Sequence, residues 1–219
     1  VWQNSFGGFN YDFFTSVQQT ADGGYIAVGR SASVDGDMTG LLKGSVDAIA
    51  VKYDADGIVT WISSFGGTAI DHYGMVQQTA DGGYIAAGYS GSSDGDLEGL
   101  NLGGEDAIIV KYLPNGDVEW KKTFGGSGKD QLLAVRQAAD GDYIAAGQSG
   151  SADGVMTGLN KGSADAILVK IAMPYSHHAG ISSLILSGIT LDQTVSEDVY
   201  AYTATVPYDV SVTTATYTT

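Results

Sequence analysis

The chain repeats itself with a period of 59 residues, and this period limits what it can fold into more than any other feature. Trp2, Trp61 and Trp120 begin equivalent segments, and the first two copies align without a gap. The third copy runs from Trp120 to about Ile171 and then stops matching. A fixed period of this size is typical of supersecondary units that stack on one another or surround an axis.

Each copy reads as two β-hairpins. In the second copy the predicted strands span residues 73–79, 84–89, 106–112 and 117–124, with a long loop at 90–105. Asp-Gly and Asn-Gly pairs in the turns supply the positive φ angles of tight hairpins. The third strand is a run of apolar residues, which indicates burial on both faces. No helical apolar period is present, and four strands per copy fit a propeller blade.

The two ends of the repeat region predict how the blades close. Trp2–Phe6 is a fourth-strand sequence without its own blade, and the third copy supplies only three strands. Pairing these ends removes exposed sheet edges, so we expect Val1–Phe6 beside Ala166–Ile171. The sequence therefore predicts an all-β, pseudo-threefold ring of three four-stranded blades, closed by the N-terminal strand. A β-prism or trefoil-like arrangement, a six-bladed ring of two chains, and a fragment of a longer propeller are the alternatives.

Several strings recur in the copies: Phe-Gly-Gly, then Asp-Gly-Gly-Tyr-Ile-Ala, then Asp-Ala-Ile-x-Val-Lys-Tyr, then Gly-x-Val-x-Trp. Over residues 1–172 these strings resemble the DGGY-type β-propeller repeats of secreted and surface-anchored bacterial and archaeal proteins. That family has no single known activity. The resemblance implies an extracellular or cell-surface scaffold or binding role rather than a reaction.

The last part of the chain changes character. Residues 174–180 read as a linker, and the Leu184-containing and Tyr202-containing segments of 181–219 resemble the first half of a cadherin-like β-sandwich module. The expected domains are a propeller-like domain at 1–173, with repeats 2–60, 61–119 and 120–172, and a partial β-sandwich at 181–219. Half a sandwich cannot bury both inner faces, so either the natural chain continues or a partner adds strands.

Composition excludes several classes of function. Asp and Glu total 25 against 10 Lys and Arg, so the net charge is −15 and nucleic acid is not an expected partner. The absence of cysteine removes disulfides, thiolate metal sites and cysteine nucleophiles. The sequence has no apolar stretch of about 20 residues, so it predicts no membrane-spanning segment.

The long loop and the strand after it repeat acidic residues that are candidate metal ligands. Ca²⁺ prefers several oxygen ligands on a flexible loop, so these residues could bind it. The alternative is a structural role, in which the side chains accept hydrogen bonds from backbone N–H groups in turns. The third copy has Val155 where the second has Asp96, which argues against a metal there. Ca²⁺ is the only cofactor that the sequence suggests. The candidate ligands are Asp35, Asp37, Asp47, Asp94, Asp96 and Asp106.

Catalysis has little support in the sequence. A nucleophilic serine needs a neighbouring base, and the repeats contain a single histidine, His72, at a position that does not repeat. We therefore expect that the chain is not an enzyme. A cluster of aromatic residues at the start of the first repeat also does not repeat, and it is a candidate interface for a protein or glycan; its members are Phe9, Tyr11, Phe13 and Phe14.

Three functions are compatible with these features. The favoured one is a non-enzymatic extracellular structural or interaction module of a larger surface, filament or adhesion protein, with a protein partner through self-assembly or strand addition. The alternative is a lectin-like carbohydrate-binding domain with one weak site per repeat, acting by multivalency. A glycan hydrolase with paired carboxylates is the weakest hypothesis.

Overall fold

The computed structural model describes residues 1–172, 183–186, 190–191, 204–205 and 215–218. The chain divides into two compact units, Val1–Ile171 and Ala172–Thr219. In the second unit β12 (Ser183–Leu186) pairs with β15 (Ala215–Thr218), and β13 (Thr190–Leu191) pairs with β14 (Ala204–Thr205), both antiparallel. The predicted linker 174–180 and most of the predicted sandwich 181–219 lie outside the described residues, so both stay predictions.

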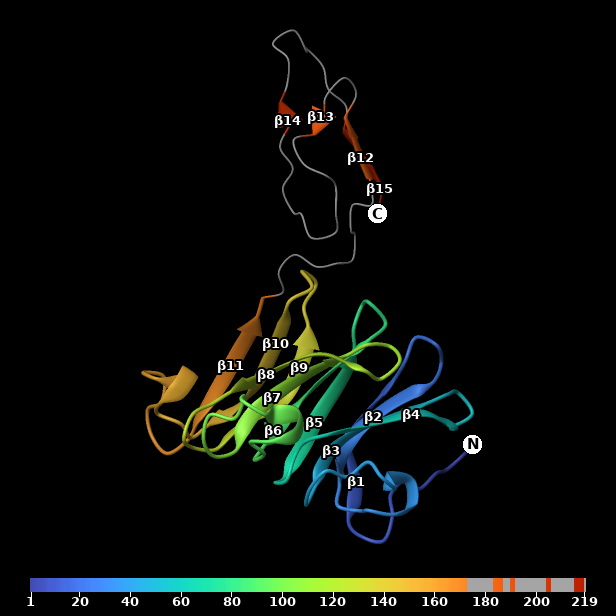
Figure 1. The fold of residues 1–219 in the computed structure, drawn as a ribbon, viewed down its shortest axis with the longest axis vertical. Helices are drawn as coiled ribbons and strands as arrows, with labels where there is room; N and C mark the ends of the chain where they lie inside the picture. Colours follow the sequence, from blue (N-terminus) through green and yellow to red (C-terminus); the bar gives the residue numbers. More distant parts are fainter. Residues whose placement is uncertain (173–182, 187–189, 192–203, 206–214, 219) are drawn as a thin grey trace. The chain divides into compact units, whose positions relative to one another are not determined.

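The first unit contains three antiparallel sheets, one for each repeat (Figure 1). In every sheet the strands lie side by side in chain order, as the hairpin turns predicted. The first sheet is β1 (Asp12–Gln19), β2 (Tyr25–Ser31), β3 (Asp47–Tyr53) and β4 (Val59–Phe65); the second is β5 (Asp71–Gln78), β6 (Tyr84–Ser90), β7 (Asp106–Tyr112) and β8 (Val118–Phe124); the third is β9 (Asp130–Gln137), β10 (Tyr143–Ser149) and β11 (Asp165–Ile171).

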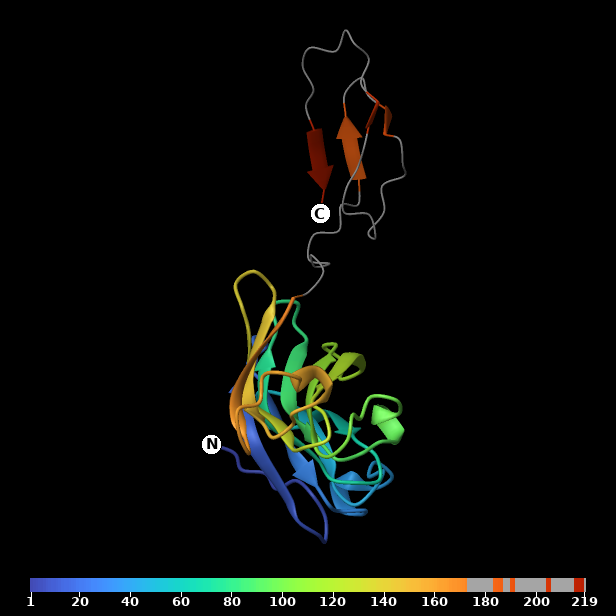
Figure 2. The same ribbon diagram turned by 90° about the vertical axis from the view of Figure 1, so that its left-hand side faces the viewer.

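The all-β prediction is confirmed, and the strands predicted for the second copy match β5 to β8 within two residues at each end. The long loops contain short 3-10 turns that the sequence did not predict: η1 (Gly36–Met38), η2 (Gly95–Leu97) and η3 (Gly154–Met156). Each turn buries its last side chain. These turns lie at one end of the sheets, and the hairpins between first and second strands lie at the other (Figure 1 and Figure 2).

The three sheets pack against one another in sequence order. Strand β5 contacts β1, β2 and β3, and β9 contacts β5, β6 and β7. We call the face of a sheet that meets the preceding repeat its front, and the opposite face its back. One buried core joins the first back to the second front; it contains Ile26, Val28, Ala48 and Ala50 from the first sheet and Tyr84, Ala86, Ile108 and Val110 from the second.

A tryptophan of each fourth strand connects its sheet to the next front. Trp61 of β4 lies with its ring centroid 5.6 Å from that of Tyr84 and 6.4 Å from that of Tyr112. Its indole N–H donates to the Pro114 carbonyl at 3.1 Å. Trp120 of β8 contacts Tyr143 at 5.6 Å in the same way. These contacts bury aromatic area while the polar N–H keeps a partner.

Glutamines fasten neighbouring sheets along their first strands. Gln18 Oε1 accepts the Gln78 backbone N–H at 2.6 Å, and Gln78 Oε1 accepts the Ala21 N–H at 2.8 Å. The next junction repeats the pattern, because Gln77 accepts from Gln137 and Gln137 accepts from Ala80, both at 2.8 Å. We call this reciprocal pair of bonds the glutamine clasp. It satisfies backbone donors that would otherwise be lost between packed sheets.

The second front also contains a hydrogen-bonded phenol pair. The hydroxyls of Tyr73 and Tyr112 are 2.7 Å apart, and both side chains are fully buried. The equivalent residues in the first sheet are Phe14 and Tyr53, and in the third they are Leu132 and Ile171. Burial raises the pKa of both phenols of the second sheet, so both stay protonated at neutral pH.

An aspartate stands at the start of the first strand of each sheet, half-buried in the first sheet and fully buried in the second and third. Asp71 is fully buried and accepts hydrogen bonds from the Ser90 hydroxyl, from the Ser92 hydroxyl at 2.8 Å and from the Gly67 N–H at 3.0 Å. Burial raises its pKa, and these donors only partly oppose the rise. The same bonds recur around Asp12 and Asp130. The carboxylates tie the Phe-Gly-Gly segments to the second strands.

The predicted closure of the ring within one chain is wrong. Residues 1–6 form no strand, and Trp2 contacts Tyr25 and Tyr53 on the first front. Among the described strands β11 pairs with β10 alone, and Figure 1 shows it at the opposite end of the unit from the N-terminus. Each front packs on the preceding back, but within the described residues no front reaches the third back. Three sheets stacked in this way do not complete a circle.

Replacing Trp61 by alanine should lower the free energy of unfolding by about 2 kcal/mol, because a half-buried ring and its contacts with two tyrosines are lost. Denaturant unfolding followed by circular dichroism measures the loss. Ile58→Asp is the matched control, because Ile58 is exposed and Asp117 occupies the equivalent position. We expect the control to change stability by less than about 0.5 kcal/mol; equal losses in the two variants would contradict the inter-sheet role of Trp61.

Acidification should stabilise the natural chain relative to an Asp71→Asn variant. The pKa of Asp71 is raised above 3.8 in the folded chain, so this group favours folding below its unfolded pKa, and that contribution is lost as pH rises through the folded pKa. The variant lacks this titration. As pH falls from about 7 to about 4, the difference in unfolding free energy should therefore shift toward the natural chain. Denaturant unfolding at several pH values measures it, and a difference independent of pH would refute the assignment.

Candidate strand-binding site

The last strand of the third sheet is exposed where its counterparts are buried. All seven residues of β3 and of β7 are buried, whereas only Ile171 of β11 is. Leu168 is 73% exposed, and its equivalents Ala50 and Ile109 are almost fully buried. The cause is that β3 and β7 have a fourth strand at their edge and a sheet on their back. In the described part of the chain β11 has neither.

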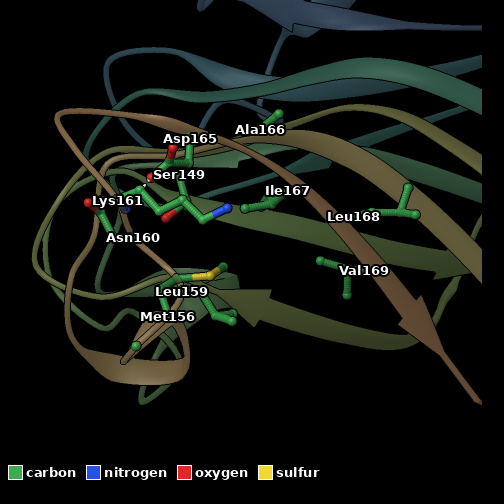
Figure 3. Close-up of a pocket in the computed structure, with 11 residues that line it drawn as sticks. Ser149, Met156, Leu159, Asn160, Lys161, Asp165, Ala166, Ile167, Leu168 and Val169 are labelled. Atoms are coloured by element: carbon green, nitrogen blue, oxygen red, sulfur yellow. Dashed lines mark hydrogen bonds between the residues drawn. The ribbon is translucent and has the colours of Figure 1, made fainter.

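A pocket of about 320 Å³ lies between the η3 loop and β11. Figure 3 shows Met156 and Leu159 of the loop facing Ile167 and Val169 of the strand. The lining is mainly apolar, with polar groups at one end. The lining residues are Ser149, Met156, Gly158, Leu159, Asn160, Lys161, Asp165, Ala166, Ile167, Leu168 and Val169.

The corresponding space in the first sheet is filled by its own fourth strand. There Ile62 of β4 packs with Leu41, Met38 and Val51. The counterparts of the last three in the third repeat are Leu159, Met156 and Val169, and all three line the pocket. Leu159 is 61% exposed because no described residue stands in the place of Ile62. The pocket is therefore the slot of a fourth strand that the described part of the chain does not supply.

The polar end of the slot also has a template in the first sheet. Asp47 Oδ2 accepts the Lys43 N–H at 2.8 Å and the Ser64 hydroxyl of β4 at 2.6 Å. Lys43 Nζ in turn donates to the Ser64 carbonyl at 2.8 Å.

The third repeat keeps the acceptor half of this arrangement. Asp165 Oδ2 accepts the Lys161 N–H at 2.5 Å, as Asp47 does from Lys43. Lys161 is also the equivalent of Lys43, so an ammonium group is available for a strand carbonyl. The slot can thus bind an extended segment that presents a hydroxyl and a backbone carbonyl beside apolar side chains.

The predicted metal ligands of the loop accept hydrogen bonds from the Phe-Gly-Gly segments. Asp94 Oδ1 accepts the Thr68 N–H at 2.8 Å, and Asp96 Oδ2 accepts the Gly66 N–H at 2.9 Å. Asp35 and Asp37 make the same bonds in the first repeat. A Cβ added at Gly67 would lie 2.2 Å from Asp94 Oδ1, so the close approach requires glycine. These oxygens therefore have the turn-forming role considered from the sequence.

The other two candidates begin the third strands. Asp47 and Asp106 are buried, and in each Oδ2 accepts a loop N–H while Oδ1 has no hydrogen-bond partner within the described residues. Burial raises the pKa of Asp106, and the charge of Asp130 adds to the rise. Over the same part of the chain no group of three or more acidic or histidine side chains is placed to hold a metal ion. A calcium site stays a prediction.

The candidate aromatic interface is divided by the first sheet. Phe13 contacts His72 of the second sheet and the Arg30 guanidinium, 4.8 Å from its ring centroid. Phe14, the next residue of β1, points to the other face and contacts Phe6 and Tyr53. Phe9 and Tyr11 precede this strand and are almost fully exposed. The four residues do not form one continuous patch, and their role in binding stays a prediction.

His72 lies between aromatic rings at the first junction. Its ring centroid is 5.9 Å from that of Phe13 and 5.2 Å from that of Tyr89. Burial, with the Arg30 charge as a second cause, lowers its pKa to about 4. The imidazole is thus neutral at physiological pH and packs between sheets.

No protein-family model matches the chain, and no curated protein matches it. The resemblance to DGGY-type repeats and to a cadherin-like module therefore stays a prediction. A search of the described residues also finds no helix with the length and apolar character needed to cross a membrane.

Sequence reasoning did not find the slot, although the signal was present. The third copy visibly lacks the fourth-strand string after Ile171. The closure predicted within one chain fills this position with Val1–Phe6 and therefore predicts no vacant slot. The position of the slot follows from the 59-residue period once the first sheet supplies the template.

Asp96→Val places in the second repeat the residue that the third repeat has at this position, Val155. If Asp96 serves as a turn acceptor, the free energy of unfolding should fall by about 1 kcal/mol, equally with added Ca²⁺ and with EDTA. Thermal unfolding in both buffers measures this. The exposed hairpin residue Asp117, replaced by the isoleucine of the first repeat, is the control. A loss seen only with Ca²⁺ would show that Asp96 is a metal ligand instead.

Proposed function

We propose that the chain is a non-enzymatic interaction module that binds an extended polypeptide segment at the free edge of β11. The observation that carries the proposal is the slot beside β11, which has the apolar lining and the polar groups of a fourth-strand site but no fourth strand within the described residues. Strand addition supplies affinity through main-chain hydrogen bonds and specificity through alternate side chains.

The chemistry of the slot restricts the partner segment. The fourth strands β4 and β8 both read Trp-x-x-Ser/Thr-Phe-Gly-Gly from Trp61 and Trp120. In the first sheet Ile62, the residue after the tryptophan, faces the apolar side of this site, and the Ser64 hydroxyl reaches the aspartate. In the second sheet the hydroxyl of Thr123 donates instead to the Leu100 carbonyl at 2.7 Å. A partner strand should therefore have a hydroxyl residue three positions after an aromatic residue, with glycines after the next aromatic one.

We place this module outside the cell, as part of a larger surface, filament or adhesion protein. That setting rests on the resemblance of the repeats to those of surface proteins. The finer architecture proposed here is a propeller whose ring is larger than three blades. It is supported by the sheet-on-sheet packing of the three repeats and by the third back, which no other described sheet covers. Propellers contain about four to eight blades.

A labelled peptide with the sequence of residues 59–68 should bind the chain saturably, as measured by fluorescence anisotropy at a protein concentration where light scattering shows single chains. Leu159→Asp, at an exposed lining residue, should weaken binding at least about tenfold, because a charge would enter the apolar slot. Val34→Asp is the matched control, since Val34 is equally exposed but lies in the first repeat. Absence of saturable binding, or equal weakening by both variants, would refute the strand-binding function.

A further inference from the structure

We propose that the segment bound at β11 is Val1–Phe6 of a second copy of this chain, and that two copies close a six-sheet ring by exchanging these segments. The inference rests on the proposed strand-binding function and adds the identity of the partner. It is carried by the coincidence of two features: an acceptor edge on the third sheet and a donor segment that already has the fourth-strand arrangement on the first.

The donor matches the fourth-strand sequence at the tryptophan, the hydroxyl residue and the Phe-Gly-Gly, but has Gln3 where β4 has Ile62. Trp2, Ser5 and Phe6-Gly7-Gly8 stand where β4 has Trp61, Ser64 and Phe65-Gly66-Gly67. It carries the tryptophan that reaches the next front and the serine that would reach the aspartate of the slot.

The donor also has the fourth-strand position relative to its own first sheet. Trp2 lies 5.6 Å from Tyr25 and 6.4 Å from Tyr53 between ring centroids, the same distances that separate Trp61 from Tyr84 and Tyr112. The Trp2 indole N–H donates to the Ala55 carbonyl at 3.1 Å, as Trp61 does to Pro114. The segment is held as β4 is held on the second front, but within the described residues it pairs with no strand.

The pairing of β3 with β4 supplies the register between copies. In the first sheet Ala48 pairs with Phe65, Ile49 with Ser64 and Lys52 with Trp61. Shifting each residue by whole repeats pairs Ala166 with Phe6, Ile167 with Ser5 and Lys170 with Trp2 of the second copy. Ser5 then meets Asp165 and Lys161, as Ser64 meets Asp47 and Lys43.

The faces that such an exchange would bring together both carry exposed apolar side chains. On the first front Phe14 is 38% and Val17 67% exposed, whereas the equivalent Tyr73 and Val76 are buried against the preceding sheet. On the third back Leu168 is exposed where Ile109 is buried. The contact would repeat an interface that the chain already makes twice, so both surfaces have an internal template.

The glutamine clasp would be kept only in part. Gln19 of the second copy stands where Gln78 and Gln137 stand, and can accept from the Ala139 N–H as they do from Ala21 and Ala80. Arg136, however, replaces the accepting Gln77. The junction between copies would therefore exchange one backbone bond for an arginine able to donate to the Gln19 amide.

The number of copies follows from the three sheets described in the first unit. Closed propellers have about four to eight blades, so with these three sheets from each copy only two copies give a ring in this range. Each copy then donates one segment and accepts one, and no sheet edge of the ring lacks its fourth strand.

The mass of the full chain in solution, measured by light scattering or sedimentation over a wide concentration range, tests the proposal. We expect a monomer–dimer equilibrium with no larger species. Leu168→Glu should raise the dimer dissociation constant by about 100-fold, because a charge would be buried between sheets. Val34→Glu is the matched control. The equivalent of Val34 in the second repeat is Ser93, which is exposed although it borders an internal junction. The control variant should therefore leave the dissociation constant unchanged.

A cross-link tests the register independently of any effect on folding. The chain has no cysteine, so a Ser5→Cys, Ile167→Cys double variant should form a disulfide between chains, seen as a two-chain band on a non-reducing gel. Ser5→Cys with Ala166→Cys, whose side chain points to the opposite face, should cross-link much less.

The outcomes separate this inference from the proposed function. A single-chain mass at all concentrations, with the peptide of residues 59–68 still bound, overturns the second copy as partner and favours further repeats or another protein. Masses beyond two chains overturn the closed ring. Equal effects of the Leu168 and Val34 variants, or a disulfide within one chain, overturn the proposed contact.

Discussion

The packing of each front against the fourth strand before it is the interaction on which the rest of this fold depends. A sheet of small and apolar residues needs packing against another element to be stable. Here Tyr84 and Tyr112 of the second front are covered by Trp61 of the preceding repeat. The covering residue and the covered residues therefore belong to different repeats. A consequence is that any number of whole repeats leaves one strand and one face unmatched at each end.

The turn aspartates set the geometry that makes this packing possible. Asp94 and Asp96 hold the Phe-Gly-Gly segment that leads from one sheet into the next, and Asp71 anchors the same segment from the strand side. The three carboxylates lie within one junction, and one oxygen of each accepts a backbone N–H group. This use of charge explains why a chain with a net charge of −15 buries several acids without a cation beside each one.

Much of the fold could be predicted because the copies of the repeat can be compared with one another. The Asp-Gly and Asn-Gly turns located the hairpins, and the apolar run of the third strand indicated burial on both faces, which β3 and β7 confirm. The angle between sheets could not be predicted. This angle is set by the volumes of the side chains that meet across the junction, such as Tyr73 against the first back. The periodicity of the sequence contains no information about it. The closure within one chain failed for this reason, and the slot beside β11 was missed with it.

The phenol pair of the second sheet has a consequence for how the chain folds. Repeats this similar can pair a strand of one copy with a strand of another, a characteristic error of repeat proteins. If β5 were to pair within the third repeat, Tyr73 would face Ile171 instead of Tyr112 and bury its hydroxyl without a phenol partner. An unsatisfied buried hydroxyl is costly. The first repeat keeps a tyrosine, Tyr53, at this position, so the pair distinguishes the strands of the second sheet from those of the third.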